Sequence, residues 1–294
     1  MNDDTTAPPT FAGRLRVSDF AYREEVSVPK KRRRADVEDV AKDASPQKKP
    51  SSCSGKRART SSKDPSVYAH LDLLPDALAP GLLVLFIGLN PGVQTARSGH
   101  AFAHPSNLFW RLLYRSGITP VACRPDEDRS LPARFRLGLT NIVARPSRHG
   151  GELRPAELDA GVALLEAKTW SWRPEVVCLV GKGIWQSVER VRYGRRPKIG
   201  GRPAFHYGWQ DEAENMGCRP PALNNDELAE YRTVADGVHD DPAWKGARIF
   251  VASSTSGLAA SLSPAEKEAI WAQLGSWTEM RRQEIETETG RKWV

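Results

Sequence analysis

Four short apolar runs, none with a charged residue at its centre, recur along the chain after residue 80. They are Gly81–Leu89, Leu137–Val143, Glu175–Val180 and Arg248–Ala252. Runs of this length without polar alternation are typical of strands that are buried on both faces of a sheet. The pattern therefore predicts four core strands.

Segments with the apolar spacing of helices separate these runs. They are Pro105–Ser116, Pro155–Trp172, a stretch from Gly181 to about Arg192, and a stretch from Ser263 to about Gln283. Ser263 before Pro264 is typical of a helix N-terminus, with serine as the cap and proline in the first turn. Strictly alternating strands and helices predict an α/β fold, a three-layer α/β/α sandwich around a mostly parallel four-stranded sheet.

Polar or small residues follow each predicted strand, where a functional site is expected. Asn90, Thr140, Gly181 and Ser253 stand at or just beyond these ends. In open parallel sheets, ligands bind beside the carboxyl ends of the strands. We therefore expect these four positions to converge on one cleft.

Composition sets the expected domain limits. Residues 1–65 contain few large apolar side chains and are predicted to be a disordered basic tail. Residues 66–284 form the predicted domain, and residues 285–294 a C-terminal tail. Within the domain, residues 194–246 are polar and rich in glycine and proline, which indicates a long insertion.

Positive charge is concentrated at the N-terminus. Residues 1–64 hold 15 Lys and Arg against 10 Asp and Glu, a net +5 of the whole chain's +7. The clusters Pro29–Arg34, Lys48-Lys49 and Lys56–Arg59 favour nuclear import or loose phosphate contacts; a merely solvated charged tail is the alternative. We expect a nuclear protein that engages the import machinery through this tail.

Cysteine usage and hydropathy narrow the class further. Cys53, Cys123, Cys178 and Cys218 are scattered without any close pair, which favours reduced thiols over a disulfide framework or a zinc site. No apolar signal region begins the chain and no apolar run is long enough to span a bilayer, so no membrane partner is expected.

Three segments carry the chemistry, and together they resemble a known family. They are Gly88-Leu89-Asn90-Pro91-Gly92, Gly99–Trp110 with its Pro105-Ser106-Asn107-Leu108-Phe109-Trp110 end, and Ser253–Ala259. The ordered set is similar to the mismatch-specific uracil-DNA and thymine-DNA glycosylases of the uracil-DNA glycosylase superfamily. The resemblance covers about Leu82–Val191 and resumes at about Arg248–Trp277, with supporting matches in Gly138–Val143 and from Arg173 to Lys182.

The resemblance implies a role for several residues. Asn90 matches the catalytic asparagine that positions the attacking water. Phe102 matches the aromatic residue that stacks on the extruded base, and Asn107 the asparagine at the following helix start. Leu258 matches the wedge that fills the gap left by the flipped nucleotide, and Gly257 and its neighbours match the loop that enters the minor groove.

General chemistry agrees with these assignments. An enzyme that acts on a base must take it out of the stack, then needs an aromatic platform and polar groups for its edge. Thr140 and Asn141 are candidates for the edge, with His100 near the bound base. Backbone N–H groups around Leu89 could stabilise the departing anion. Ser254 and Ser256 could contact phosphate or only cap the helix that follows.

A neutral amide at position 90 can hold a water but deprotonates it poorly, so slow chemistry is expected. Good leaving groups should then help, and uracil with a 5-halogen should be released faster than thymine. No metal, organic cofactor or lyase lysine is implied. His100 and His104 could suggest a metal, but no third ligand has fitting spacing. The expected partner is double-stranded DNA with G·U or G·T mispairs, bound by a monomer.

Three alternatives remain. One is a broader uracil glycosylase that ignores the opposite base, since Leu258-Ala259-Ala260 lacks the arginine some relatives carry beside the wedge. Another is a catalytically silent DNA-binding or damage-sensing protein on the same fold. The third is a nucleotide-binding α/β protein, which the lack of a complete phosphate loop around Lys182 disfavours.

Overall fold

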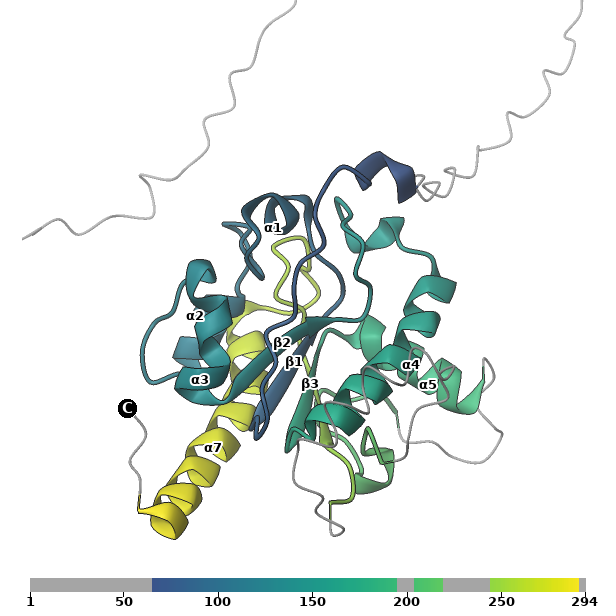
Figure 1. Cartoon of the computed structure of the whole chain (residues 1–294). Helices are drawn as coiled ribbons and strands as arrows, with labels where there is room; N and C mark the ends of the chain where they lie inside the picture. The colour runs from purple at the N-terminus through teal and green to yellow at the C-terminus, as the bar shows by residue number, and fades with distance from the viewer. Residues whose placement is uncertain (1–64, 195–203, 219–243, 291–294) are drawn as a thin grey trace, which may run out of the picture. The chain divides into compact units, whose positions relative to one another are not determined.

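The computed structural model describes residues 65–194, 204–218 and 244–290, all within one compact unit. A five-stranded sheet lies between two helical layers (Figure 1). Its elements, in chain order, are η2 (Pro65–Tyr68), β1 (Val84–Gly88), α1 (Val93–Ser98), α2 (Phe109–Arg115), η3 (Pro125–Ser130), α3 (Leu131–Phe135), β2 (Leu137–Asn141), η4 (Gly150–Glu152), α4 (Pro155–Trp172), β3 (Val176–Val180), α5 (Lys182–Tyr193), β4 (Gly208–Trp209), η5 (Glu212–Glu214), β5 (Arg248–Ala252) and α7 (Pro264–Thr289).

The strand order is β2-β1-β3-β5-β4, and the first four of these strands run parallel. This confirms the α/β class and the mostly parallel sheet. The predicted strand count is wrong by one, because β4 adds to the edge of β5 in antiparallel orientation. Two residues are too short a strand to carry a period-2 signal, and Gly208 has a φ of +100° that breaks any regular pattern.

Both faces of the sheet are dry, which explains the unbroken apolar runs. Val84 and Phe86 of β1 pack with α2, α3 and α7, whereas Leu85 and Ile87 pack with α4 and α5. Side chains of a strand alternate between its two faces, so a strand covered on both sides must be apolar throughout. Figure 1 shows α2, α3 and α7 on one side of the sheet and α4 and α5 on the other.

The C-terminal helix is longer than the sequence pattern suggests. Ser263 accepts a hydrogen bond from the Glu266 backbone N–H, and the Glu266 carboxylate accepts one from the Ser263 N–H, which confirms the predicted N-terminus. The helix then continues to Thr289 rather than to about Gln283, and Gly290 ends it in the left-handed conformation. Buried Ile285 therefore belongs to the core, not to a separate tail.

The described part of the predicted insertion completes the sheet edge. Met216 is fully buried, and its backbone pairs with Ala247 just before β5. The Arg192 guanidinium, at the end of α5, binds Glu166 of α4 and Glu214 of the insertion. Residues 204–218 therefore cover the exposed edge of β5, a structural role that protects an otherwise unpaired strand. The remaining insertion residues, the basic clusters and Cys53 lie outside the described residues.

Candidate active site

A cavity of about 1350 Å³ opens at the carboxyl ends of the parallel strands. Its lining includes Leu89 and Asn90 after β1, Asn141 at the end of β2 and Val180 at the end of β3. The segment 254–259, after β5, also lines it. Of the four positions expected to converge, Asn90 and Thr140 line the cavity. Gly181 and Ser253 do not, although their neighbours Val180 and Ser254 do. This volume exceeds the 300–1,000 Å³ of ordinary small-molecule pockets, which fits a groove that admits part of a polymer.

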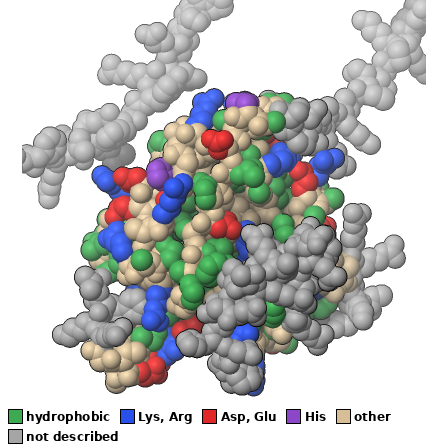
Figure 2. Space-filling model, viewed as in Figure 1, with side chains coloured by type: hydrophobic (Ala, Val, Ile, Leu, Met, Phe, Trp, Pro, Cys, Tyr) green, Lys and Arg blue, Asp and Glu red, His purple; other side chains and the backbone are tan. Residues whose placement is uncertain are grey.

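Uncharged side chains dominate the view of this end of the sheet. Figure 2 shows Lys and Arg mainly toward the margins of the upper surface, with apolar and neutral polar groups and a few Asp or Glu side chains between them. Among the described residues that line the cavity, Arg148 is the only Arg or Lys and Asp128 the only Asp or Glu. Binding in the cavity therefore depends on shape and hydrogen bonds more than on bulk charge.

The Asn90 amide is held in one orientation. Its Nδ2 donates to the backbone oxygens of Pro91 and Arg145, both at 3.1 Å, and to Ser147 Oγ at 2.9 Å. Carbonyl oxygens only accept, so the amide cannot turn over without facing two acceptors with its own oxygen. No described residue donates to Oδ1, which leaves that atom as an acceptor for a ligand or water.

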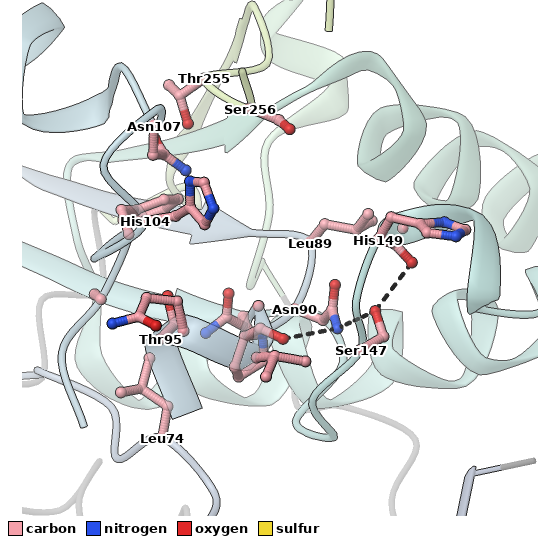
Figure 3. Close-up of a pocket in the computed structure, with 18 of the residues that line it drawn as sticks. Leu74, Leu89, Asn90, Thr95, His104, Asn107, Ser147, His149, Thr255 and Ser256 are labelled. Atoms are coloured by element: carbon pink, nitrogen blue, oxygen red, sulfur yellow. Dashed lines mark hydrogen bonds between the residues drawn. The ribbon is translucent and has the colours of Figure 1, made fainter. Parts of the chain in front are cut away.

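Ser147 extends this arrangement into a chain of hydrogen bonds, drawn in Figure 3. Its hydroxyl accepts from Asn90 and donates to the backbone oxygen of His149 at 3.0 Å. The serine side chain is almost fully buried, so both bonds are shielded from water. Ser147 was missed from the sequence, because nothing local marks a serine that meets its partner 57 residues away.

An ion pair supports the segment that carries these acceptors. The Arg145 guanidinium binds both carboxylate oxygens of Glu157 on α4 and also donates to the backbone oxygen of Glu152. Hydrogen bonding from Arg145 lowers the pKa of Glu157 to about 2. The backbone of Arg145, which accepts from Asn90, is therefore tied to the helical layer.

Phe102 also lines the cavity, and its ring stacks on Phe109 with ring centroids 3.9 Å apart and planes 14° apart. Its φ of +53° is in the left-handed region, which costs a bulky residue about 1 kcal/mol. The preceding residue, Ala101, donates to the buried Asp128 carboxylate and accepts from the Trp110 indole. These bonds on each side of Ala101 hold the ring in place despite the strain.

Asn141 and Gly88 shape the space beside this ring. The Asn141 side chain lines the cavity, and no described residue forms a hydrogen bond with its amide. A Cβ added to Gly88 would collide with Asn141 Oδ1 and lie 3.2 Å from Phe102 Cζ. Glycine at this position therefore allows an amide and an aromatic ring to border the same space.

Thr140 differs from the expectation for a residue that reads a base edge. Its hydroxyl donates to Asp76 at 2.7 Å and accepts from Lys168 Nζ at 2.9 Å, while Lys168 pairs with the other Asp76 oxygen. The side chain is buried although the residue borders the cavity. Its hydrogen bonds thus fix the segment before β1 to the sheet edge, and Asn141 is left as the available polar group.

The positions of the two histidines differ from the expectation that His100 lies near the bound base. His100 is not among the residues that line the cavity, because its ring pairs with Asp128 at 3.1 Å. His104 does line it and contacts Ser106 Oγ at 2.8 Å. Asn107 also borders the cavity and accepts from the N–H of Phe109, the first residue of α2. Leu108 is the N-cap, so Asn107 stands one residue before the helix start that the motif implied.

The loop after β5 lies against this same segment. Leu108 N–H donates to the Thr255 backbone oxygen at 2.9 Å, and a Cβ on Gly257 would lie 2.5 Å from Ser106 Oγ. Ser256 Oγ accepts from the Leu258 N–H at 3.3 Å, an internal loop contact. Leu258 itself is 81% exposed, the most exposed large apolar side chain of the described residues.

Ser254 and Ser256 both border the cavity, and each hydroxyl accepts a backbone N–H two residues later. Neither caps α7, since Ser263 does so. Figure 3 shows Ser256 and Thr255 near Asn107 and His104, across the cavity from Ser147 and His149. The predicted site residues, His100 excepted, therefore border one space.

Other features constrain the chemistry of the described residues. Cys123 and Cys178 form no disulfide, and burial raises the pKa of Cys178 well above its usual value. No described group of three His, Cys, Asp or Glu side chains is arranged to hold a metal ion. Within the same residues, no helix has both the length and the apolar character to cross a membrane.

Comparisons with known proteins identify the family. The family model described as "Uracil DNA glycosylase superfamily" matches residues 75–275. A curated relative from Schizosaccharomyces pombe (strain 972 / ATCC 24843), named "G/U mismatch-specific uracil DNA glycosylase", is 32% identical over 207 residues. That match covers 69% of this chain and 53% of the relative, so the chain spans about half the length of the relative it matches.

Proposed function

Because this chain belongs to the uracil DNA glycosylase superfamily, we propose that it is a monofunctional DNA glycosylase that removes uracil mispaired with guanine. It hydrolyses the N-glycosidic bond and leaves an abasic site, the first step of base excision repair. One observation carries this proposal. The Asn90 amide is locked through Nδ2, so that its Oδ1 is free to hold a water in the cavity.

The reaction follows from this geometry. The nucleotide is extruded into the cavity, where the base lies beside Phe102 and its edge meets the Asn141 amide. Asn90 Oδ1 accepts a hydrogen bond from a water molecule and holds it against the anomeric carbon. The bond from that carbon to the base nitrogen breaks, and its electron pair leaves with the base. The water oxygen then bonds to the carbon, and its proton passes to solvent.

The cavity explains why slow chemistry is expected. Asp128 is the one carboxylate among the described residues that line the cavity, and it already binds Ala101 and His100, so the water is placed by Asn90 rather than activated, a positioning effect. Backbone N–H groups at Leu89 and Asn90 stabilise the anionic base as it departs. Base release should therefore rise with the acidity of the base, and 5-fluorouracil should leave faster than uracil, and uracil faster than thymine.

The absence of a lysine from the described cavity lining favours hydrolysis over a lyase reaction, which needs an amine nucleophile. Thymine opposite guanine is the second proposed substrate. The name of the fission-yeast relative supports guanine as the opposite base, but no arginine stands beside Leu258 to contact it. Recognition of that base would rest on the shape and backbone groups of residues 254–259.

A substrate panel tests the proposal. Duplexes with G·U, A·U, G·T and G·5-fluorouracil pairs, and single-stranded uracil, are incubated with excess protein and scored for alkali-labile abasic sites. Release from G·5-fluorouracil and G·U, with slower release from G·T, supports it. Equal release from all uracil substrates supports the glycosylase that ignores the opposite base. Binding to mispaired DNA without any base release contradicts the proposal and supports the silent DNA-binding protein.

Localisation and association complete the proposal. The protein acts as a monomer in the nucleus, directed there by the clusters Pro29–Arg34 and Lys56–Arg59. Phosphate attraction by the same clusters should make DNA affinity fall with salt. Replacing the basic residues of both clusters by glutamine in a fluorescent fusion tests the first point. Loss of nuclear accumulation is expected, whereas unchanged accumulation would contradict it.

A further inference from the structure

Lys267, in the first turns of α7, is a buried lysine with an unusual environment. Only 5% of the residue is exposed, and its Nζ donates to the backbone oxygen of Ala259 at 2.7 Å. No carboxylate of the described residues lies within ion-pair distance of this ammonium group. Burial of an ammonium group is costly unless hydrogen bonds compensate it, so its single loop contact should be strong.

The hydrogen bond from Lys267 to Ala259 lies next to the predicted wedge residue. Ala259 directly follows Leu258, the most exposed large apolar side chain of the described residues. On the other side of Leu258, the close approach of Gly257 to Ser106 and the bond from Leu108 to Thr255 hold the loop. Leu258 thus projects between two anchored points, one on the segment before α2 and the other on α7.

The geometry points to Lys267 as a positioning residue that holds Leu258 ready to enter the DNA stack. This inference rests on the proposed function, because it assigns Lys267 a part in extrusion of the base by that glycosylase. A wedge must fill the gap left by the flipped nucleotide before the stack closes again. A loop that is already ordered avoids the entropy cost of ordering on the DNA, and so lowers the cost of extrusion.

The role of Lys267 is therefore distinct from that of the water-holding site. It does not line the cavity, whereas Ala259, its hydrogen-bond partner, does. Loss of the ammonium group should leave the Asn90 amide in place and loosen only the residues around Leu258. The defect should appear in base extrusion and should vanish when the wedge side chain is already absent.

A double-mutant cycle tests this role. Base release from a G·U duplex is measured under single turnover for the wild type, Lys267→Met, Leu258→Ala and the double variant. Methionine keeps most of the apolar volume without the charge or the donor. We expect Lys267→Met to slow release about tenfold in the wild-type background and less than twofold in the Leu258→Ala background. An equal slowing in both backgrounds would overturn the inference.

Two further measurements separate positioning from general damage. Extrusion is followed without catalysis by the fluorescence of 2-aminopurine placed beside a non-hydrolysable uracil analogue; Lys267→Met should reduce the signal. Lys168→Met is the matched control, because the Lys168 side chain is only 18% exposed but pairs with Asp76 rather than with the loop after β5. An equal loss of extrusion in both lysine variants would contradict the inference.

Thermal melting establishes that each variant is folded, and Lys267→Gln replaces Lys267→Met if the latter does not fold. The two proposals also fail differently. If the wild type releases no base from any duplex, the glycosylase proposal is wrong, while the fluorescence experiment still tests the loop. If the wild type is active but the cycle is additive, only the role of Lys267 is wrong.

Discussion

Removal of the Ser147 hydroxyl tests how the Asn90 amide is held. Ser147→Ala deletes one of three acceptors of Nδ2 and leaves the two backbone oxygens. A buried neutral hydrogen bond contributes about 0.5–1.5 kcal/mol to orientation, so a loss near 1 kcal/mol corresponds to about a fivefold slower step. The Asn90 amide should keep its position but have a less fixed orientation. The rate of base release should therefore fall, whereas the affinity for DNA should not.

The assay is single-turnover release from a G·U duplex, with duplex affinity measured separately. Ser187→Ala is a matched control, because Ser187 is also fully buried but lies on α5, away from the cavity lining. Both variants should lose similar thermal stability, and only Ser147→Ala should lose rate. A rate for Ser147→Ala within twofold of the wild type, or an equal loss in Ser187→Ala, would refute the reasoning.

Three further predictions follow from separate contacts. Gly257→Ala would force a methyl against Ser106, so we expect a loss of about 1–3 kcal/mol in the free energy of unfolding and slower base release from duplex DNA. Gly183→Ala is the control, because its added methyl meets nothing within 4 Å. It should show neither effect in the same melting and release assays. Glu157→Gln should cost about 1–2 kcal/mol at pH 7, allowing for partial solvent screening. Because the folded pKa of Glu157 is lowered to about 2, that difference should shrink as the pH falls from about 5 toward 2 in urea unfolding, and a constant difference would contradict the ion pair. Thr140→Val should lower the melting temperature but retain base release within about threefold, since the lost hydroxyl bonds are internal; a loss above a hundredfold would restore Thr140 as a base-contacting residue.

The strands could be predicted where burial on both faces requires every residue to be apolar. β1, β3 and β5 are covered on both faces, so each reads as an unbroken apolar run in the sequence. β4 and α1 were not predicted, because two and six residues are too few for either periodicity to emerge. The end of α7 was also missed, since its last turns face solvent except at Ile285.

The candidate site was predictable where a motif fixes a local geometry. Asn90 follows β1 and Asn107 stands just before α2, so each position could be placed from its neighbours alone. Ser147 and Lys267 could not be found in this way. The partner of Ser147 is 57 residues away, and that of Lys267 lies in the irregular loop before α7, so only the packed structure shows that a buried serine and a buried lysine meet the amide and the wedge loop.

His100 and Thr140 are two residues that the sequence predicted as base contacts and whose side chains bind other groups. Each stands next to a residue that borders the cavity, which made it a reasonable candidate for contact with the base. Their side chains instead satisfy Asp128 and Asp76, carboxylates that a sequence pattern does not connect to them. Adjacency along the chain places a backbone but not the direction of a side chain.

The most direct test of the account measures base release by Asn90→Ala under single turnover, with excess protein and a G·U duplex. Removal of the amide takes away Oδ1 while the cavity wall remains, so duplex binding should change little and release should fall by at least about a hundredfold. A folded Asn90→Ala variant that releases uracil within a few fold of the wild-type rate would contradict the claim that this amide holds the attacking water.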